Sequence, residues 1–212
     1  MNVSVHSSLE TRVGILAIEI PSVRVASEDS ALDEEIRLHT ARLEELHRGK
    51  RSSQVDGTGR ARDLYKALGI DPTKTRPSSE ALLRRVLQGN PFPRINTLVD
   101  CVNLLSLRFL LPYGLYDLQS IRPPIELRIG KAGEGYSGIR KDRVNLEGRP
   151  ALFDSEGPFG NPTSDSDRAK ITLSTRGGLV VCFHPPSLAE SELERIRKES
   201  VATIDQFCGV SG

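Results

Sequence analysis

The amino-acid sequence predicts an α+β fold, in which helices pack against a mixed or antiparallel sheet. Helix-like segments dominate the first half of the chain, strand-like segments dominate the part after residue 124, and one strand and one helix stand at the two ends. This order lacks the regular alternation of strand and helix that is typical of a parallel α/β sheet. The chain has 212 residues, which is enough for one large domain with its own core.

The first predicted elements are a strand and two helices. Residues 13–20 form a short apolar run rich in branched side chains and followed by a proline, which predicts a buried strand. Residues 31–48 are charged and free of proline, with Leu and Ile at near-helical spacing, and they predict an amphipathic helix. Residues 60–68 predict a shorter helix that ends at Gly69.

Two more helices precede the strands. A rigid segment with two prolines leads to a helix that ends at Gly89, with Ser78 or Ser79 as its expected N-cap. Residues 95–111 form the longest apolar helical pattern, which ends before Pro112. Its expected buried face, with spacings of four, three and four, consists of Leu98, Val102, Leu105 and Phe109.

From residue 125 the pattern changes to strands. Short strands are predicted at 125–130, around Val144 and at 151–154, and residues 157–168 read as a polar loop. Residues 170–186 predict a hairpin that turns at two glycines, 177 and 178. Residues 188–207 predict a charged C-terminal helix capped near Ser187.

Composition narrows the function classes. Lys and Arg number 29 against 28 Asp and Glu, so the net charge of +1 does not indicate a protein that coats DNA or RNA. The three cysteines are widely spaced, which favours reduced thiols and a cytoplasmic location. No signal-peptide pattern and no apolar run of membrane-spanning length is present, so no membrane partner is expected.

Familiar short motifs do not indicate a cofactor. Gly133, Gly135 and Gly138 spell the dinucleotide fingerprint, but no helical pattern follows, so a turn between strands is predicted. Asp165 and Asp167 are candidate ligands for a hard cation, although no third carboxylate is evident near them. The four histidines have no spacing typical of a zinc site. We expect neither a metal nor a cofactor.

Two polar features are candidates for a binding site. Asn96, Asp100 and Asn103 repeat on one face of the 95–111 helix, where they face solvent, pair with turns of neighbouring segments or line a wet pocket. Residues 163–168 are either a solvated turn or a binding loop. Basic clusters occur at Lys50-Arg51, Arg60/Arg62, Arg84-Arg85 and Arg140-Lys141/Arg143. They are either solvated faces or a rim that contacts phosphates.

Residues 95–121 carry a resemblance to a known family. The features are the pair Asn96 and Asp100, then Asn103, the Pro112 break and the Tyr116-Asp117 pair. This stretch resembles the B3/B4 (tRNA-editing) domain of the phenylalanyl-tRNA synthetase beta subunit. The segments RPSSEALLRRVL and RPALFDSEGPFGNPTSDSDR look like free-standing members of that family, so the resemblance covers roughly residues 60–186. It implies one domain over 1–212 that includes the terminal strand and helices.

The resemblance implies a pocket between the sheet and the 95–111 helix that hydrolyses the ester of a wrong amino acid on tRNA. The expected partners are the aminoacylated 3′ end of tRNA and the amino acid, with no DNA. The synthetase pattern has Thr where Val102 stands, His where Gly114 stands and Glu near Asn161, so specificity for tyrosine does not carry over. An activated ester needs a placed water and oxyanion stabilisation rather than a nucleophilic triad.

The resemblance also implies roles for individual residues. The expected catalytic residues are Asn103, Thr163, Ser164 and Asp165. The expected substrate-binding residues are Arg76, Ser78, Asn96, Asp100, Asp117, Asn161, Ser166 and Arg168. Two other functions remain as alternatives: a non-catalytic module that binds tRNA, other RNA or an amino acid, and a metal-dependent hydrolase that uses Asp165 and Asp167.

Overall fold

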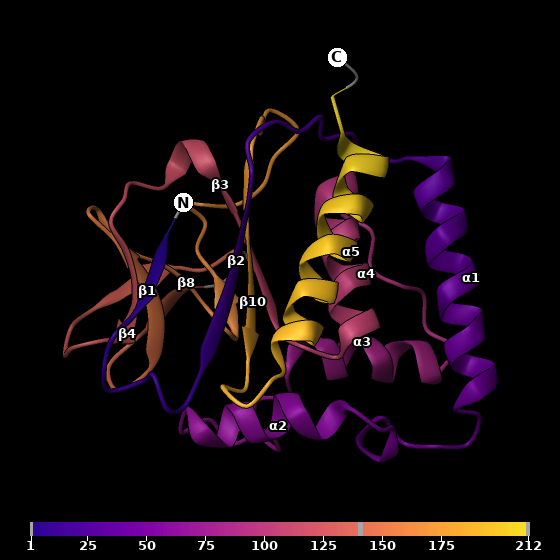
Figure 1. The fold of residues 1–212 in the computed structure, drawn as a ribbon, viewed down its shortest axis with the longest axis horizontal. Helices are drawn as coiled ribbons and strands as arrows, with labels where there is room; N and C mark the ends of the chain where they lie inside the picture. The colour runs from indigo at the N-terminus through magenta and orange to yellow at the C-terminus, as the bar shows by residue number, and fades with distance from the viewer. Residues whose placement is uncertain (1, 140–141, 211–212) are drawn as a thin grey trace.

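The protein has the predicted α+β architecture, built in three layers. The computed structural model describes residues 2–139 and 142–210. A five-stranded sheet forms one outer layer, a three-stranded sheet lies in the middle, and helices α4 and α5 form the other outer layer, with α1 on the side of α4 away from the sheets (Figure 1). Among the described helices none is long and apolar enough to cross a membrane.

The five-stranded sheet is mixed and has the order β1-β4-β7-β8-β9. Its strands are β1 (Val3–Val5), β4 (Ile125–Ile129), β7 (Pro150–Asp154), β8 (Gly157–Asn161) and β9 (Ser164–Asp165). β1 pairs parallel with β4, and the other neighbours are antiparallel. A small separate ribbon pairs β5 (Gly135–Ser137) with β6 (Arg143–Asn145).

The three-stranded sheet is antiparallel, with β10 (Gly178–His184) between β2 (Gly14–Ile20) and β3 (Tyr113–Asp117). All seven residues of β10 are buried, because alternate side chains enter two different cores. Leu179, Val181 and Phe183 pack toward the five-stranded sheet. Val180 and Cys182 pack toward the helices. A strand covered on both faces needs this nearly continuous apolar sequence.

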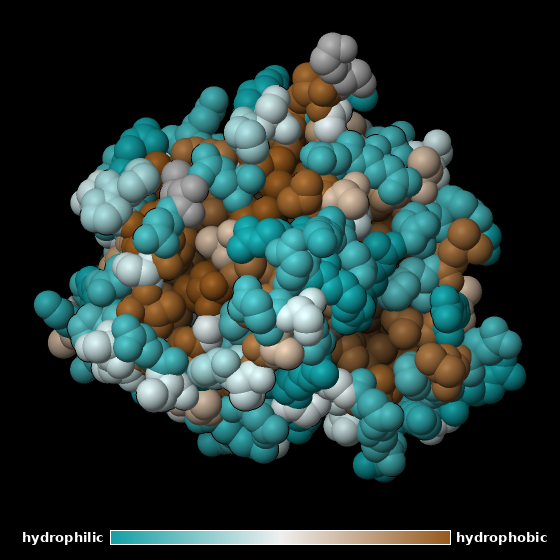
Figure 2. All heavy atoms as spheres, viewed as in Figure 1, coloured by the Kyte–Doolittle hydropathy of each residue, from teal (hydrophilic) through white to brown (hydrophobic). Residues whose placement is uncertain are grey.

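The helices lie within two or three residues of their predicted positions. They are α1 (Ser30–Leu46), α2 (Thr58–Ala67), α3 (Ser78–Leu87), α4 (Thr97–Phe109) and α5 (Glu190–Cys208), with 3-10 turns η1 (Ser52–Gln54) and η2 (Leu118–Ser120). The four predicted core residues of α4 are all buried. The outward face of α5 is hydrophilic (Figure 2), as its charge pattern predicts.

Two predictions about the C-terminal half are wrong. The predicted 170–186 hairpin does not form, because β10 pairs with β2 and β3 and residues 170–176 contain no strand. The predicted 157–168 loop instead contains β8 and β9. Strand pairing depends on partners far away in the chain, which local turn signals do not reveal.

The predicted serine caps are also wrong. α3 starts after Pro77 and α5 starts after Ala189, and neither helix has a side-chain hydrogen bond at its cap. α4 does have one: the Asn96 side chain accepts a hydrogen bond from the Val99 backbone N–H at 3.0 Å. This cap fixes the start of α4, the helix beside the candidate site.

Candidate functional site

A cleft of about 530 Å³ separates α4 from β3 and the segment that follows β9. Its walls are mostly apolar, with a few polar side chains among them, which is the usual composition of a small-molecule site. The apolar lining consists of Ile95, Val99, Val102, Tyr113, Leu115, Ile139 and Ile171. The polar lining consists of Asn103, Asp165, Asp167 and Lys170.

A smaller hollow of about 160 Å³ adjoins this cleft. Val102, Asn103, Tyr113 and Asp165 line both spaces, so they form the shared wall. The remaining polar lining of the inner hollow comes from Ser78, Ser106, Asn161, Thr163 and Ser164. Asn103 and the 163–165 segment, which the sequence analysis placed in one site, therefore lie around one hollow.

The β8–β9 turn that carries Asp165 is held by Asn161. Its Oδ1 accepts three hydrogen bonds, from the Thr163 backbone N–H (2.8 Å), the Thr163 hydroxyl (2.8 Å) and the Ser164 backbone N–H (2.9 Å). The Tyr65 hydroxyl donates to the Pro162 carbonyl at 2.5 Å, which ties the turn to α2. These bonds fix the backbone of the turn before any ligand binds.

Asp165 lies half-buried at the end of β9, where both hollows meet. Burial raises the pKa of its carboxyl from the ordinary 3.8 to about 7, and the nearby Tyr116 hydroxyl opposes this rise. That hydroxyl is itself buried, and it does not reach a hydrogen bond of ordinary geometry with any described residue. A carboxyl with a pKa near neutrality is suited to general acid–base work.

Two glycines make room for the fully buried Tyr116. A Cβ on Gly114 would stand 2.2 Å from the Tyr116 hydroxyl oxygen, and a Cβ on Gly160 would stand 2.3 Å from the ring and from that oxygen. The ring packs edge-on against Phe159, with the centroids 4.9 Å apart. Gly114, where the synthetase pattern has His, is thus required by the position of Tyr116.

Four residues predicted to bind substrate have structural partners instead. Asn96 caps α4, and the fully buried Asp100 accepts hydrogen bonds from Arg94 (2.8 Å) and the Ile95 N–H (2.9 Å). Asp117 accepts from the Gln119 N–H (2.9 Å) and the Thr175 hydroxyl (2.6 Å). Ser166 is fully buried and accepts from the Ala169 N–H at 3.3 Å. None of the four lines the cleft or the inner hollow.

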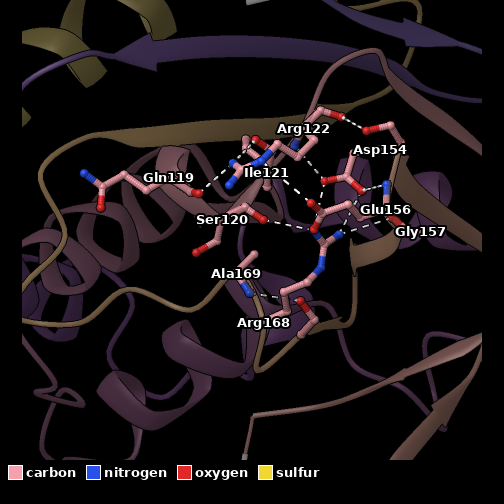
Figure 3. Close-up of polar contacts among 11 residues, drawn as sticks. Gln119, Ser120, Ile121, Arg122, Asp154, Glu156, Gly157, Arg168 and Ala169 are labelled. Atoms are coloured by element: carbon pink, nitrogen blue, oxygen red, sulfur yellow. Dashed lines mark hydrogen bonds and ion pairs between the residues drawn. The ribbon is translucent and has the colours of Figure 1, made fainter.

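Arg168 does not line the cleft either, and its side chain lies in a polar cluster that joins β7, β8 and η2 (Figure 3). Its guanidinium donates to both oxygens of Asp154 at 3.0 Å, to the Ser120 carbonyl at 2.9 Å and to Glu156 at 3.3 Å. The Asp154 side chain is completely buried. Arg168 therefore neutralises a buried carboxylate, a requirement that its loop sequence did not show.

Of the two remaining residues, Ser78 lines the inner hollow and Arg76 does not. Arg76 lines a separate basic hollow with Arg62, Arg84 and the residues at 50–53. Of the predicted basic clusters, the 50–51, 62 and 84 positions do converge there, while Arg140 and Lys141 lie outside the described residues.

Several residues of the cleft were not predicted from the sequence. Tyr113, Lys170 and Ile171 line it although none was singled out. Tyr113 follows the helix break at Pro112, and its strand β3 was itself not predicted. The signal that could have located Tyr113 is strand periodicity: alternate side chains of a strand lie on one face, and Tyr113 and Leu115 of β3 both line the cleft.

Neither motif considered for a metal or a dinucleotide forms a ligand set. Asp165 and Asp167 both line the cleft, but Asp167 pairs with Lys170 at 2.7 Å, and only Asp165 also lines the inner hollow. In the described part of the chain, no group of three or more His, Cys, Asp and Glu side chains is placed to hold a metal ion. Gly135 lies in strand β5, and the next described element after the glycine motif is strand β6, so among the described residues no helix N-terminus follows the motif.

Comparisons with known proteins identify the family. The chain is similar to an N-terminal fragment of the phenylalanyl-tRNA synthetase beta subunit from Pyrococcus horikoshii, with 14% identity and a TM-score of 0.47. The match covers 96% of this chain and 49% of that structure, so the chain spans about half its length. No curated protein is significantly similar. The B3/4 domain family matches residues 60–201, and the chain therefore belongs to that family.

Proposed function

We propose that the protein hydrolyses the ester bond of mischarged aminoacyl-tRNA, as a trans-acting editing enzyme. The observation that carries this proposal is the meeting of the Asp165 carboxyl and the Asn103 side chain on the wall shared by the two hollows. Membership of the B3/4 domain family supports it. The cleft also has the size of ordinary ligand sites, roughly 300–1,000 Å³.

In the proposed reaction the Asp165 carboxylate takes a proton from a water molecule that attacks the ester carbonyl carbon. The bond between the carbonyl carbon and the ribose oxygen then breaks, and the ribose oxygen receives the proton. The products are the free amino acid and the uncharged tRNA. General bases work best when their pKa lies near the working pH, and burial brings the pKa of Asp165 to about 7.

Asn103 is proposed to orient the ribose or to donate to the developing oxyanion. Its side chain has no hydrogen-bond partner in the described part of the chain, so its amide is available to a ligand. Thr163 and Ser164 are proposed to contact the aminoacyl group from the inner hollow. The apolar wall, with Val99, Val102 and Ile171, would surround the amino acid side chain.

A panel of misacylated tRNAs tests this proposal. We expect the purified protein to release the amino acid from at least one member well above the uncatalysed rate, and strong chelation to leave that rate unchanged. The measurement is the loss of labelled aminoacyl-tRNA with time. Decay of every member at the uncatalysed rate would remove the enzymatic proposal, and a loss of activity on chelation would favour metal-dependent hydrolysis through Asp165 and Asp167.

Replacing Tyr116 with phenylalanine should shift the pH dependence of the reaction upward. The Tyr116 hydroxyl lowers the pKa of Asp165, so its removal raises that pKa further. The midpoint of kcat/KM against pH should move to higher pH, while the plateau rate at high pH stays close to that of the wild type. An unchanged midpoint in a folded variant would show that Asp165 does not control the profile.

The alternative is a module that binds tRNA or an amino acid without turnover. Two observations favour it: the Thr163 hydroxyl is held by Asn161, and Val102 replaces a hydroxyl-bearing residue of the synthetase pattern. It predicts saturable binding with no hydrolysis. Binding of a free amino acid that does not depend on salt would locate the ligand in the apolar cleft, whereas strong salt dependence would indicate phosphate contacts.

A further inference from the structure

The basic hollow lined by Arg62, Arg76 and Arg84 has a volume of about 360 Å³ and lies where η1, α2 and α3 meet. Five cationic side chains and one carboxylate line it: Lys50, Arg51, Arg62, Arg76, Arg84 and Glu80. These charges give the lining a net charge of +4, whereas the whole chain is only +1, so the remainder of the chain is −3. Such a concentration of charge in a concave surface attracts anions.

The carboxylate in this hollow is already neutralised. Glu80 is 1% exposed and accepts two hydrogen bonds from Arg62, at 2.7 and 3.1 Å. The Ser52 hydroxyl donates to it at 3.2 Å, and Arg76 approaches it to 3.5 Å. Glu80 therefore fixes Arg62 and Arg76 in place rather than repelling an incoming anion.

The other three cations have no such partner. Among residues 2–139 and 142–210, the side chains of Lys50, Arg51 and Arg84 form no ion pair or hydrogen bond, and all three are exposed. They stand on two separate segments, the connection after α1 and the last turn of α3. Like charges brought together from separate segments repel one another, so an anionic ligand would relieve a cost that the fold otherwise bears.

We propose that this basic hollow binds the phosphate backbone of an RNA strand whose end enters the cleft. The proposal rests on the proposed editing function for the identity of the strand. Arg76 lines the basic hollow and Ser78 lines the inner hollow of the cleft. Their Cα atoms can be at most about 7 Å apart, because the chain spans at most about 3.6 Å per residue. One strand can therefore contact both sites.

A triple variant, Lys50→Gln, Arg51→Gln and Arg84→Gln, tests this inference without disturbing the Glu80 network. We expect its Kd for unacylated, unfractionated tRNA to rise about tenfold at moderate salt, because three phosphate contacts are lost. The slope of log Kd against log salt should fall by about 2, at roughly 0.7 for each contact to a single strand. Thermal unfolding would establish that the variant is folded.

The matched control removes three exposed cations from α5: Arg195→Gln, Arg197→Gln and Lys198→Gln. The control changes net charge equally, so an equal loss of tRNA binding in both triples would overturn the proposal, as would unchanged binding in the first triple. Complete displacement of tRNA by millimolar inorganic phosphate would also overturn it, in favour of a site for a single phosphate.

A phosphate-free substrate separates this inference from the proposed function. An aminoacyl ester of adenosine reaches the cleft but has no phosphate for the basic hollow. If both proposals hold, the first triple hydrolyses this ester at the wild-type rate while its tRNA affinity falls. If only the editing proposal fails, neither the wild type nor either triple variant hydrolyses the ester or any misacylated tRNA. The first triple variant still binds tRNA more weakly than the control triple variant.

Discussion

Replacing Asp165 with asparagine is expected to lower kcat/KM for deacylation by about 10²–10⁴-fold, the range that general acid–base catalysis contributes. Asparagine keeps the shape of the side chain but cannot accept a proton at neutral pH. In the wild type, kcat/KM should rise with pH through a midpoint near 7 and level off at higher pH, where the carboxyl is fully ionised. The variant should lose this rise once uncatalysed decay is subtracted.

The same substitution should stabilise the folded protein at high pH. The pKa of Asp165 is higher in the folded chain, about 7, than the ordinary 3.8, so the folded chain binds more protons between those values. The free energy of unfolding therefore falls as pH rises through this window and stays low above it. Asparagine removes that cost, worth about 1–2 kcal/mol at pH 8 after allowance for solvent screening of a half-buried group.

Two results would contradict this account of Asp165. A variant that stays folded and deacylates at the wild-type rate would exclude Asp165 as the base. If the substitution changed the melting temperature equally at pH 4 and pH 8, burial of the Asp165 charge would be excluded as the cause of the change in stability. Asp205→Asn, on the exposed side of α5, is the matched control and should change neither activity nor the pH dependence of unfolding.

Replacing Arg168 with methionine is expected to destabilise the fold by about 2–4 kcal/mol, because it leaves the buried Asp154 carboxylate without its cation. For a chain of this size, this corresponds to roughly 2–4 °C in Tm for each kcal/mol. The loss should lie at or somewhat below the lower end of the roughly 3–5 kcal/mol that breaking a buried ion pair costs. The reason is that Asp154 still accepts from the backbone N–H groups of Arg122 (2.8 Å) and Glu156 (2.9 Å).

This destabilisation should depend on pH in the opposite sense to that of Asp165. Burial raises the pKa of Asp154, but the hydrogen bonds from Arg168 and the two backbone N–H groups outweigh burial and lower it overall. The contribution of the pair is therefore present above the unfolded pKa, near 4, and is lost as pH falls through the lower folded pKa. The difference in unfolding free energy between wild type and variant should shrink in acid.

A double-mutant cycle with Asp154→Asn checks that the two side chains act as a pair. The double variant should be more stable than the sum of the single losses predicts, by about 1 kcal/mol or more. Arg37→Met, which breaks a fully exposed ion pair with Glu34, is the matched control and should leave the unfolding free energy nearly unchanged. The buried pair would be contradicted if the stability losses at Asp154 and Arg168 were additive, or if Arg37→Met lost as much stability as Arg168→Met.

The candidate site was only partly visible in the sequence. The polar stripe along α4 serves two purposes: Asn96 and Asp100 hold the start of the helix, while Asn103 lines the cleft. The polar run after Pro162 divides in the same way, because Asp165 reaches the cleft and Arg168 reaches Asp154. Each set consists of polar residues close together in the sequence, so only the position of distant partners separated those that line the cleft from those that hold the fold together.

The sequence by itself determined the α+β class, the five helices and the buried face of α4, because helical periodicity depends on residues three or four positions apart. The tertiary structure alone decided which strands flank β10, which cations converge around Glu80 and how far burial shifts the pKa of Asp165. Each of these depends on segments far apart in the chain, and local pattern does not encode the distance between them.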